Sequence, residues 1–138
     1  THPSRTLCPG TPLLWDAGYT RTIPDLDFLP AAVVAGRIIS KIKQNICLDL
    51  GYKSIASEMK HPRLHFMELE YEEVLNHSEE HLVLKCSDAD QHYIGDVVYA
   101  LPSHICPTMA LHEHAYVLRK QKVTETWKVV ARKRMYPF

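Results

Sequence analysis

Residues 96–108 read DVVYALPSHICPT, and this stretch decides the fold that we expect. The run Val97 to Leu101 is apolar and contains β-branched and aromatic side chains, which favour a β-strand. The segment after it lies between Pro102 and Pro107, and proline fixes the backbone and lacks an amide hydrogen. We therefore predict an apolar strand that leads into an extended segment held by two prolines.

Further strand-like runs lie on both sides of this stretch, at intervals of roughly 8–12 residues or more, a spacing typical of all-β folds. Residues 120–122, Lys-Gln-Lys, indicate a short hairpin turn between the last two runs, and a short helix is predicted at residues 52–60. The expected fold class is mainly β: a single β-barrel or sandwich-like domain with at most one or two short helices. The runs are 31–42, 45–50, 63–69, 81–85, 113–119 and 123–132.

The first of these runs, 31–42, fits two interpretations. Pro30 is a residue type that often starts a helix, and Ala32, Ala35 and Ile39 have helical spacing. The run also contains β-branched pairs, and Gly36 interrupts the middle of it. We therefore favour a long buried strand over a helix.

Length and charge exclude several classes of protein. The chain has 138 residues, of which 46% are hydrophobic and 23% charged, as in ordinary globular domains. Its formal net charge of zero gives no basic surface for nucleic acid. No apolar run reaches the ~20 residues of a membrane span, and a complete (β/α)8 barrel needs roughly 200 residues or more.

The first thirty residues differ in composition from the rest. They contain five prolines, at positions 3, 9, 12, 24 and 30, so an extended lead-in is expected over 1–30, with 31–138 as the β-domain. Within the lead-in, only Leu13 to Trp15 is strand-like.

The cysteines indicate a reducing compartment. Cys8, Cys47, Cys86 and Cys106 form no C-x-x-C pair, and no secretory signal precedes them. We expect a cytoplasmic chain with reduced thiols.

The segment after the strand at 97–101 is the best candidate for chemistry. In an extended segment, residues two apart point to the same side, so His104 and Cys106 are candidates to bind one metal ion. An imidazole and a thiolate suit a borderline-soft cation such as zinc, and two protein ligands leave coordination positions open. The alternative is a packed strand-to-loop junction with an inert cysteine.

Other histidines give weaker signals. His112 and His114 could complete a four-ligand site, or they could be two solvated side chains at a strand start. His61 and His65 have the spacing of a helical metal pair, but Pro62 between them disfavours a helix.

Two charged motifs are also candidates. Glu80 and His81 are adjacent, so on a strand they point to opposite faces and are not expected to touch. Lys53 follows a turn at Gly51, and we interpret it as a surface lysine.

Taken in order, five motifs resemble the C-terminal part of the D-threonine aldolase and D-serine dehydratase family. The closing segment 127–132 is also similar to the final strand of that family. The resemblance extends from about residue 9 to residue 134. The motifs are Pro9-Gly10-Thr11, Trp15-Asp16-Ala17-Gly18-Tyr19, Asp49-Leu50-Gly51-Tyr52-Lys53, Ser78-Glu79-Glu80-His81 and Pro102-Ser103-His104-Ile105-Cys106-Pro107-Thr108.

The resemblance implies a two-domain enzyme of fold type III. Such enzymes hold pyridoxal phosphate on a lysine of an alanine-racemase-like barrel, and a β-domain supplies a divalent metal, zinc or manganese, through a His-x-Cys pair. That pair corresponds here to His104 and Cys106. The metal engages the β-hydroxyl of a D-β-hydroxy amino acid during aldol cleavage or dehydration.

The barrel and its cofactor lysine have no counterpart in these 138 residues, and Lys53 is not expected to replace that lysine. One hypothesis is a metal-binding β-domain that is active only with a separate barrel chain. The alternative is a non-catalytic β-domain that serves as a binding or oligomerising module, most simply a homodimer. A stand-alone metal-dependent hydrolase has only the histidine count in its favour.

Overall fold

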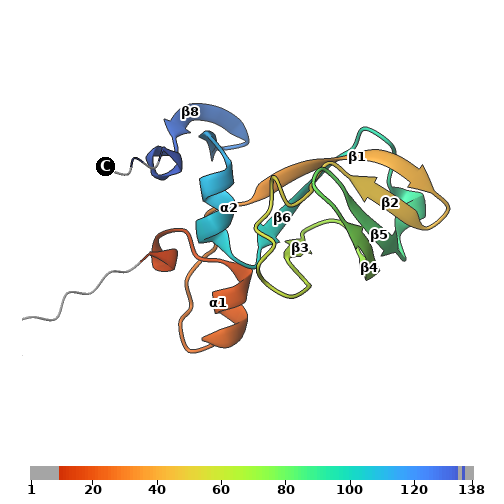
Figure 1. Ribbon diagram of the computed structural model, residues 1–138, viewed down its shortest axis with the longest axis horizontal. Coiled ribbons are helices and arrows are strands. Elements are labelled where there is room, and N and C mark those ends of the chain that lie inside the picture. Colours follow the sequence, from red (N-terminus) through yellow and green to blue (C-terminus); the bar gives the residue numbers. More distant parts are fainter. Residues whose placement is uncertain (1–9, 134, 136–138) are drawn as a thin grey trace, which may run out of the picture.

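The computed structural model describes residues 10–133 and 135 of the chain. Its main feature is a curled six-stranded antiparallel sheet that forms a half-barrel, with strand order β3-β6-β1-β2-β5-β4 (Figure 1). The strands of this sheet are β1 (Val34–Ile42), β2 (Asn45–Leu48), β3 (Leu64–Phe66), β4 (Tyr71–His77), β5 (Leu82–Cys86) and β6 (Val97–Pro102).

The other elements are short. A two-stranded sheet of β7 (His114–Arg119) and β8 (Lys122–Lys128) follows the second α-helix. The described residues include two α-helices, α1 (Ala17–Thr22) and α2 (Ile105–Leu111), and the 3-10 turns η1 (Thr11–Leu13), η2 (Ala89–Gln91) and η3 (Val130–Arg132). The predicted fold class, mainly β with one or two short helices, is confirmed.

The core is formed by alternate side chains of the central strands. Ile46 and Leu48 of β2 are fully buried, and they lie opposite Leu84 and Leu82 of β5. Each such side chain stabilises the fold by roughly 1.5–3 kcal/mol relative to an exposed one. Alternate residues of β2 and β5 are buried, and this period of two is the pattern that predicted strands at residues 45–50 and 81–85.

Two strand predictions need correction. Residues 31–42 do form a strand, β1, but only Gly36 and Ile38 in that range are buried, so the expectation of a wholly buried strand was wrong. The sequence analysis also missed β4. This strand lies at the edge of the sheet and carries Glu72 and Glu73, as edge strands often carry charges, so its apolar alternation is weak.

The helix predicted at 52–60 does not form. The amide of Tyr52 donates to the carbonyl of Ser78 at 2.9 Å, and the amide of Lys53 donates to that of Glu79 at 3.0 Å. These contacts fix the start of the segment against another turn. The segment continues as turns and bends rather than as a helix.

The lead-in is partly helical. The strand predicted at Leu13 to Trp15 was wrong, because Thr11–Leu13 forms the turn η1 and α1 follows at Ala17. Trp15 is buried and donates from Nε1 to Thr20 Oγ1 at 2.8 Å, and its ring packs 5.0 Å from that of Phe28. Cys8 and Pro9 of the sequence motifs lie outside the described residues.

The predicted hairpin at the end of the chain is confirmed, with Lys120 and Gln121 in the left-handed region that tight hairpin turns need. The strand predicted to reach Arg132 ends at Lys128, and η3 follows. All residues of β8 are exposed. No helix within the described ranges is long and apolar enough to cross a membrane.

Gly51 provides a test of the contact between the two turns. Its amide donates to Glu80 O at 3.0 Å, and a Cβ at this position would overlap the backbone of Glu79. We expect Gly51→Ala to lower the free energy of unfolding by about 1–3 kcal/mol in urea denaturation. Gly10→Ala is the matched control, since a Cβ there meets open space. Equal stability of both variants would contradict the described packing.

Candidate metal site

The candidate ligands lie where β6 ends and α2 begins. His104 has an extended backbone and precedes the helix, whereas Cys106 is already its second residue. The extended segment predicted around Cys106 was therefore wrong. Pro107 does not prevent the helix, because the first turn of a helix needs no amide hydrogen for its own ladder.

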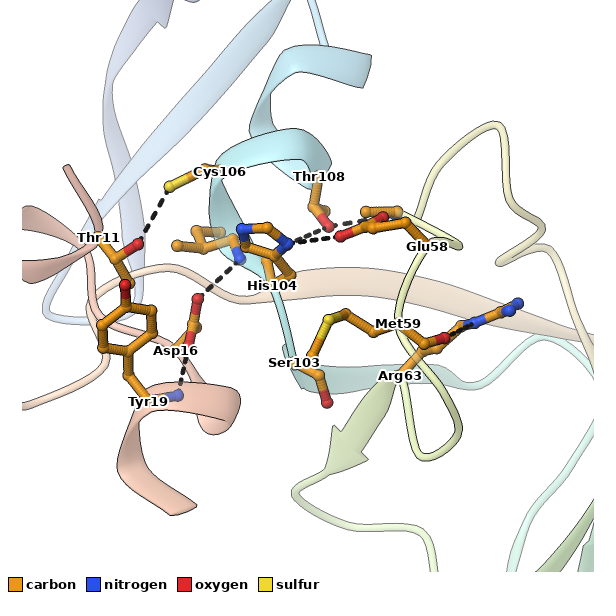
Figure 2. Close-up of polar contacts among 12 residues, drawn as sticks. Thr11, Asp16, Tyr19, Glu58, Met59, Arg63, Ser103, His104, Cys106 and Thr108 are labelled. Atoms are coloured by element: carbon orange, nitrogen blue, oxygen red, sulfur yellow. Dashed lines mark hydrogen bonds and ion pairs between the residues drawn. The ribbon is translucent and has the colours of Figure 1, made fainter. Parts of the chain in front are cut away.

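A carboxylate from the lead-in fixes the start of this helix. Asp16 is fully buried; its Oδ2 accepts from the amide of Ile105 at 3.0 Å, and its Oδ1 accepts from the amide of Tyr19 at 2.8 Å. One side chain thus caps α2 and α1 together (Figure 2). Gly18 lies against this junction, because a Cβ there would overlap the carbonyl of Ser103.

A second carboxylate holds His104. Its Nδ1 lies 2.5 Å from Oε1 of Glu58, and both side chains are partly exposed, at 37% and 47%. A carboxylate accepts hydrogen bonds, so Nδ1 is the donor and carries a proton. Figure 2 shows Glu58 on one side of the imidazole and Cys106 on the other.

Among the cysteines that the structure describes, Cys106 is the exposed one. Its Sγ lies 3.2 Å from Thr11 Oγ1 of the lead-in. Burial raises the pKa of Cys47, and it raises the pKa of Cys86 to about 12, so these two thiols are poor sources of thiolate. The structure therefore favours Cys106 as the reactive thiol of the described chain.

Thr108 joins the helix to the loop that carries Glu58. Its hydroxyl donates to the carbonyl of His104 at 2.8 Å and accepts from the amide of Ala56 at 3.2 Å. Thr108 is buried, so these bonds are shielded from water. The loop and the helix are thereby held in fixed positions relative to each other.

The donor set fits a divalent metal of the zinc type. Glu58 engages Nδ1 of His104 and leaves Nε2 as the nitrogen that could bind a metal, and the thiol of Cys106 is accessible. The described part of the chain contains no group of three or more His, Cys, Asp or Glu side chains arranged to hold a metal. His104 and Cys106 would therefore need further ligands from water, a substrate or another part of a protein.

The other candidate histidines, all within the described part of the chain, do not join this pair. His112 contacts the carbonyl of Ser54 through Nε2 at 2.9 Å, and His114 is an exposed residue of β7. The ring of His61 lies 5.7 Å from that of His77, and burial lowers the pKa of His61. Burial also lowers the pKa of His65, on β3.

The two charged motifs, 49–53 and 78–81, form ion pairs with each other. Lys53 Nζ lies 2.7 Å from Glu80 and 3.0 Å from Glu79. These carboxylates raise the pKa of Lys53, which stays protonated. Lys53 is therefore an exposed lysine held by two carboxylates, in line with its interpretation as a surface lysine.

Sequence reasoning missed Glu58, Thr11 and Thr108 as parts of the site. Glu58 precedes His104 by 46 residues, and no local pattern links them. Asp16 was part of a recognised motif, and its place before a six-residue helix is a capping signal that the prolines nearby obscured.

Comparison with solved structures shows where this fold occurs. The D-threonine aldolase of Filomicrobium marinum is 25% identical, with a TM-score of 0.72 over 90% of this chain and 34% of that one. The D-threo-3-hydroxyaspartate dehydratase of Delftia sp. HT23 is 18% identical, with a TM-score of 0.58 over 72% of this chain and 32% of that one. This chain therefore spans about a third of the length of these proteins.

Two variant structures of a D-threo-3-hydroxyaspartate dehydratase, each 17% identical, have TM-scores of 0.58 and 0.57. They cover 72% and 71% of this chain and 32% and 31% of those chains. One variant replaces a cysteine by alanine and is in the metal-free form, and the other replaces a histidine two positions earlier. The comparison with curated proteins gave no match.

The amino-acid sequence itself matches a domain family over most of the β-domain. The match covers residues 31–118, from the start of the strand-rich region through α2 and β7, and the family is described as "Putative serine dehydratase domain". It includes His104, Cys106 and Glu58, and it agrees with the resemblance drawn from the five motifs. The chain belongs to this serine dehydratase domain family.

Proposed function

We propose that this chain is the metal-binding β-domain of a pyridoxal-phosphate lyase that acts on D-β-hydroxy amino acids. His104 and Cys106 hold a divalent metal, zinc or manganese, and a barrel carried by another chain or another part of a longer protein holds the cofactor. The reaction is aldol cleavage or dehydration, and the β-domain is inactive without the barrel.

The observation that carries this proposal is the combination of an accessible thiol and an oriented imidazole. Cys106 is exposed, and Glu58 engages Nδ1 of His104 so that Nε2 is left for a metal. The His-x-Cys spacing is also that of the two side chains replaced in the dehydratase variants, one of which is in the metal-free form. The shared fold supports an equivalent use of the pair in this chain.

A metal held by His104 and Cys106 would act as a Lewis acid, which would lower the pKa of a substrate hydroxyl or make hydroxide a better leaving group. Other residues of the chain hold the two candidate ligands in place. Asp16 fixes the helix start that carries Cys106, Thr11 contacts the thiol, and Glu58 fixes the imidazole. The amine of Lys53 is occupied by Glu79 and Glu80, which supports a cofactor lysine outside these 138 residues.

The metal claim is tested by titration of Zn²⁺ into the reduced chain, followed by calorimetry. We expect the wild-type chain to bind Zn²⁺, and His104→Ala or Cys106→Ala to weaken binding by about tenfold or more, since even outer-sphere partners of a metal are worth that much.

The matched control is His114→Ala, which removes an exposed imidazole ten residues from His104. This variant should bind Zn²⁺ like the wild type. No binding by the wild type, or identical binding by the wild type and His104→Ala, would show that the pair is not a metal site.

The enzyme claim is tested by reconstitution. The chain is mixed with a barrel chain of the same family, pyridoxal phosphate and Zn²⁺ or Mn²⁺, and release of glycine and acetaldehyde from D-threonine is measured; dehydration is followed as ammonia release from D-serine. Activity should require both chains, and His104→Ala should abolish it. Failure of every such mixture would refute the proposed catalytic role.

A second candidate function is an oligomerising module, favoured by the exposed hairpin. Leu118 and Val123 are register partners of β7 and β8, and they are 59% and 60% exposed. Burial of such side chains against a second copy is favourable. For this function we expect a dimer in sedimentation velocity, weakened by Leu118→Lys and Val123→Lys; a strict monomer at high concentration would contradict it.

A further inference from the structure

We infer that Glu58 is a positioning residue that fixes the Nδ1–H tautomer of His104 and so presents Nε2 to the metal. This inference rests on the proposed function. In this role, Glu58 binds the imidazole of His104 and is not itself a ligand of the metal. Glu58 acts through the imidazole that it orients.

The geometry determines the direction of the hydrogen bond. Oε1 of Glu58 lies 2.5 Å from Nδ1 of His104, and an ionised carboxylate can only accept. In the neutral imidazole, the proton therefore resides on Nδ1 and the lone pair on Nε2. A carboxylate on the far nitrogen also fixes the orientation of the ring, which favours a bond between Nε2 and a metal.

Glu58 is itself held by contacts on both sides of it in the chain. Before it, the amide of Ala56 donates to Thr108 Oγ1 at 3.2 Å. After it, the carbonyl of Met59 accepts from Nε of Arg63 at 2.8 Å (Figure 2). The carboxylate is therefore placed by its own loop, even though its side chain is 47% exposed.

A second set of contacts ties this loop to the helix of the site. Thr108 lies on α2 and also donates to the carbonyl of His104 at 2.8 Å. At the end of the same helix, His112 contacts the carbonyl of Ser54 at 2.9 Å. Because the middle of α2 and its C-terminal end both hold the loop, Glu58 and His104 keep their relative position without a metal.

The experiment compares wild type, Glu58→Ala and Glu58→Gln in the full 138-residue chain, with Glu68→Gln as the control. Glu68 is an exposed carboxylate with no hydrogen bond or ion pair from its side chain in the described ranges. Two quantities are measured: the Zn²⁺ dissociation constant, and the tautomer of metal-free His104 from its ¹⁵N shifts in mildly alkaline buffer. Amide spectra confirm that each variant is folded.

We expect Glu58→Ala to weaken Zn²⁺ binding by about 10–100-fold and to move His104 toward the Nε2–H tautomer. Glu58→Gln keeps an acceptor oxygen and should recover part of the affinity and most of the Nδ1–H tautomer. The control should match the wild type in both quantities.

Three results would overturn the role of Glu58. If the wild type binds Zn²⁺ and Glu58→Ala changes neither quantity, Glu58 alone loses its role and the proposed function stands. If Zn²⁺ affinity falls but the tautomer stays the same, the carboxylate acts only as a nearby charge. If the wild type binds no Zn²⁺ at all, the proposed function fails and this role fails with it.

Discussion

The buried carboxylate of Asp16 accepts hydrogen bonds from the first turns of two different helices, at Tyr19 in α1 and at Ile105 in α2. Hydrogen bonds to a charged acceptor contribute about 1.5–3 kcal/mol each, and leaving the buried amide of Ile105 unpaired would cost a similar amount. The N-terminal lead-in is therefore part of the site. Without Asp16, the helix that begins after His104 would have no side-chain cap, because His104 provides none.

The long loop between β2 and β3 makes two separate sets of contacts. Its beginning, at Gly51, docks on the turn that contains Glu80, and the ion pairs of Lys53 cover that contact. Further along, it brings Glu58 to His104. Two motifs that are far apart in the sequence, 49–53 and 78–81, thus contact each other, and the candidate metal ligands lie in a third motif, at 103–108. The lysine of the first motif is held by two carboxylates of the second.

Strands were predictable where one side of the strand is buried, as in β2, β5 and β6, because burial imposes a period of two. The edge strand β4 lacks that signal. The pair of ligand candidates, His104 and Cys106, could be recognised from spacing, but the reason given for it was wrong, because α2 replaces the extended segment. Glu58 and Thr11 reach the site only through tertiary contacts, which no local pattern encodes. Thr108 lies in the same segment as the ligand candidates, and its long-range contact is the bond from the amide of Ala56.

The central claim is that the start of α2 presents one imidazole nitrogen and one thiolate to a metal. Anomalous scattering at the zinc edge, from crystals grown with Zn²⁺, tests this claim most directly. We expect an ion about 2.0–2.3 Å from both Nε2 of His104 and Sγ of Cys106, with Glu58 still on Nδ1. Zinc bound only elsewhere, or bound through Nδ1 of His104 with Glu58 displaced, would contradict it.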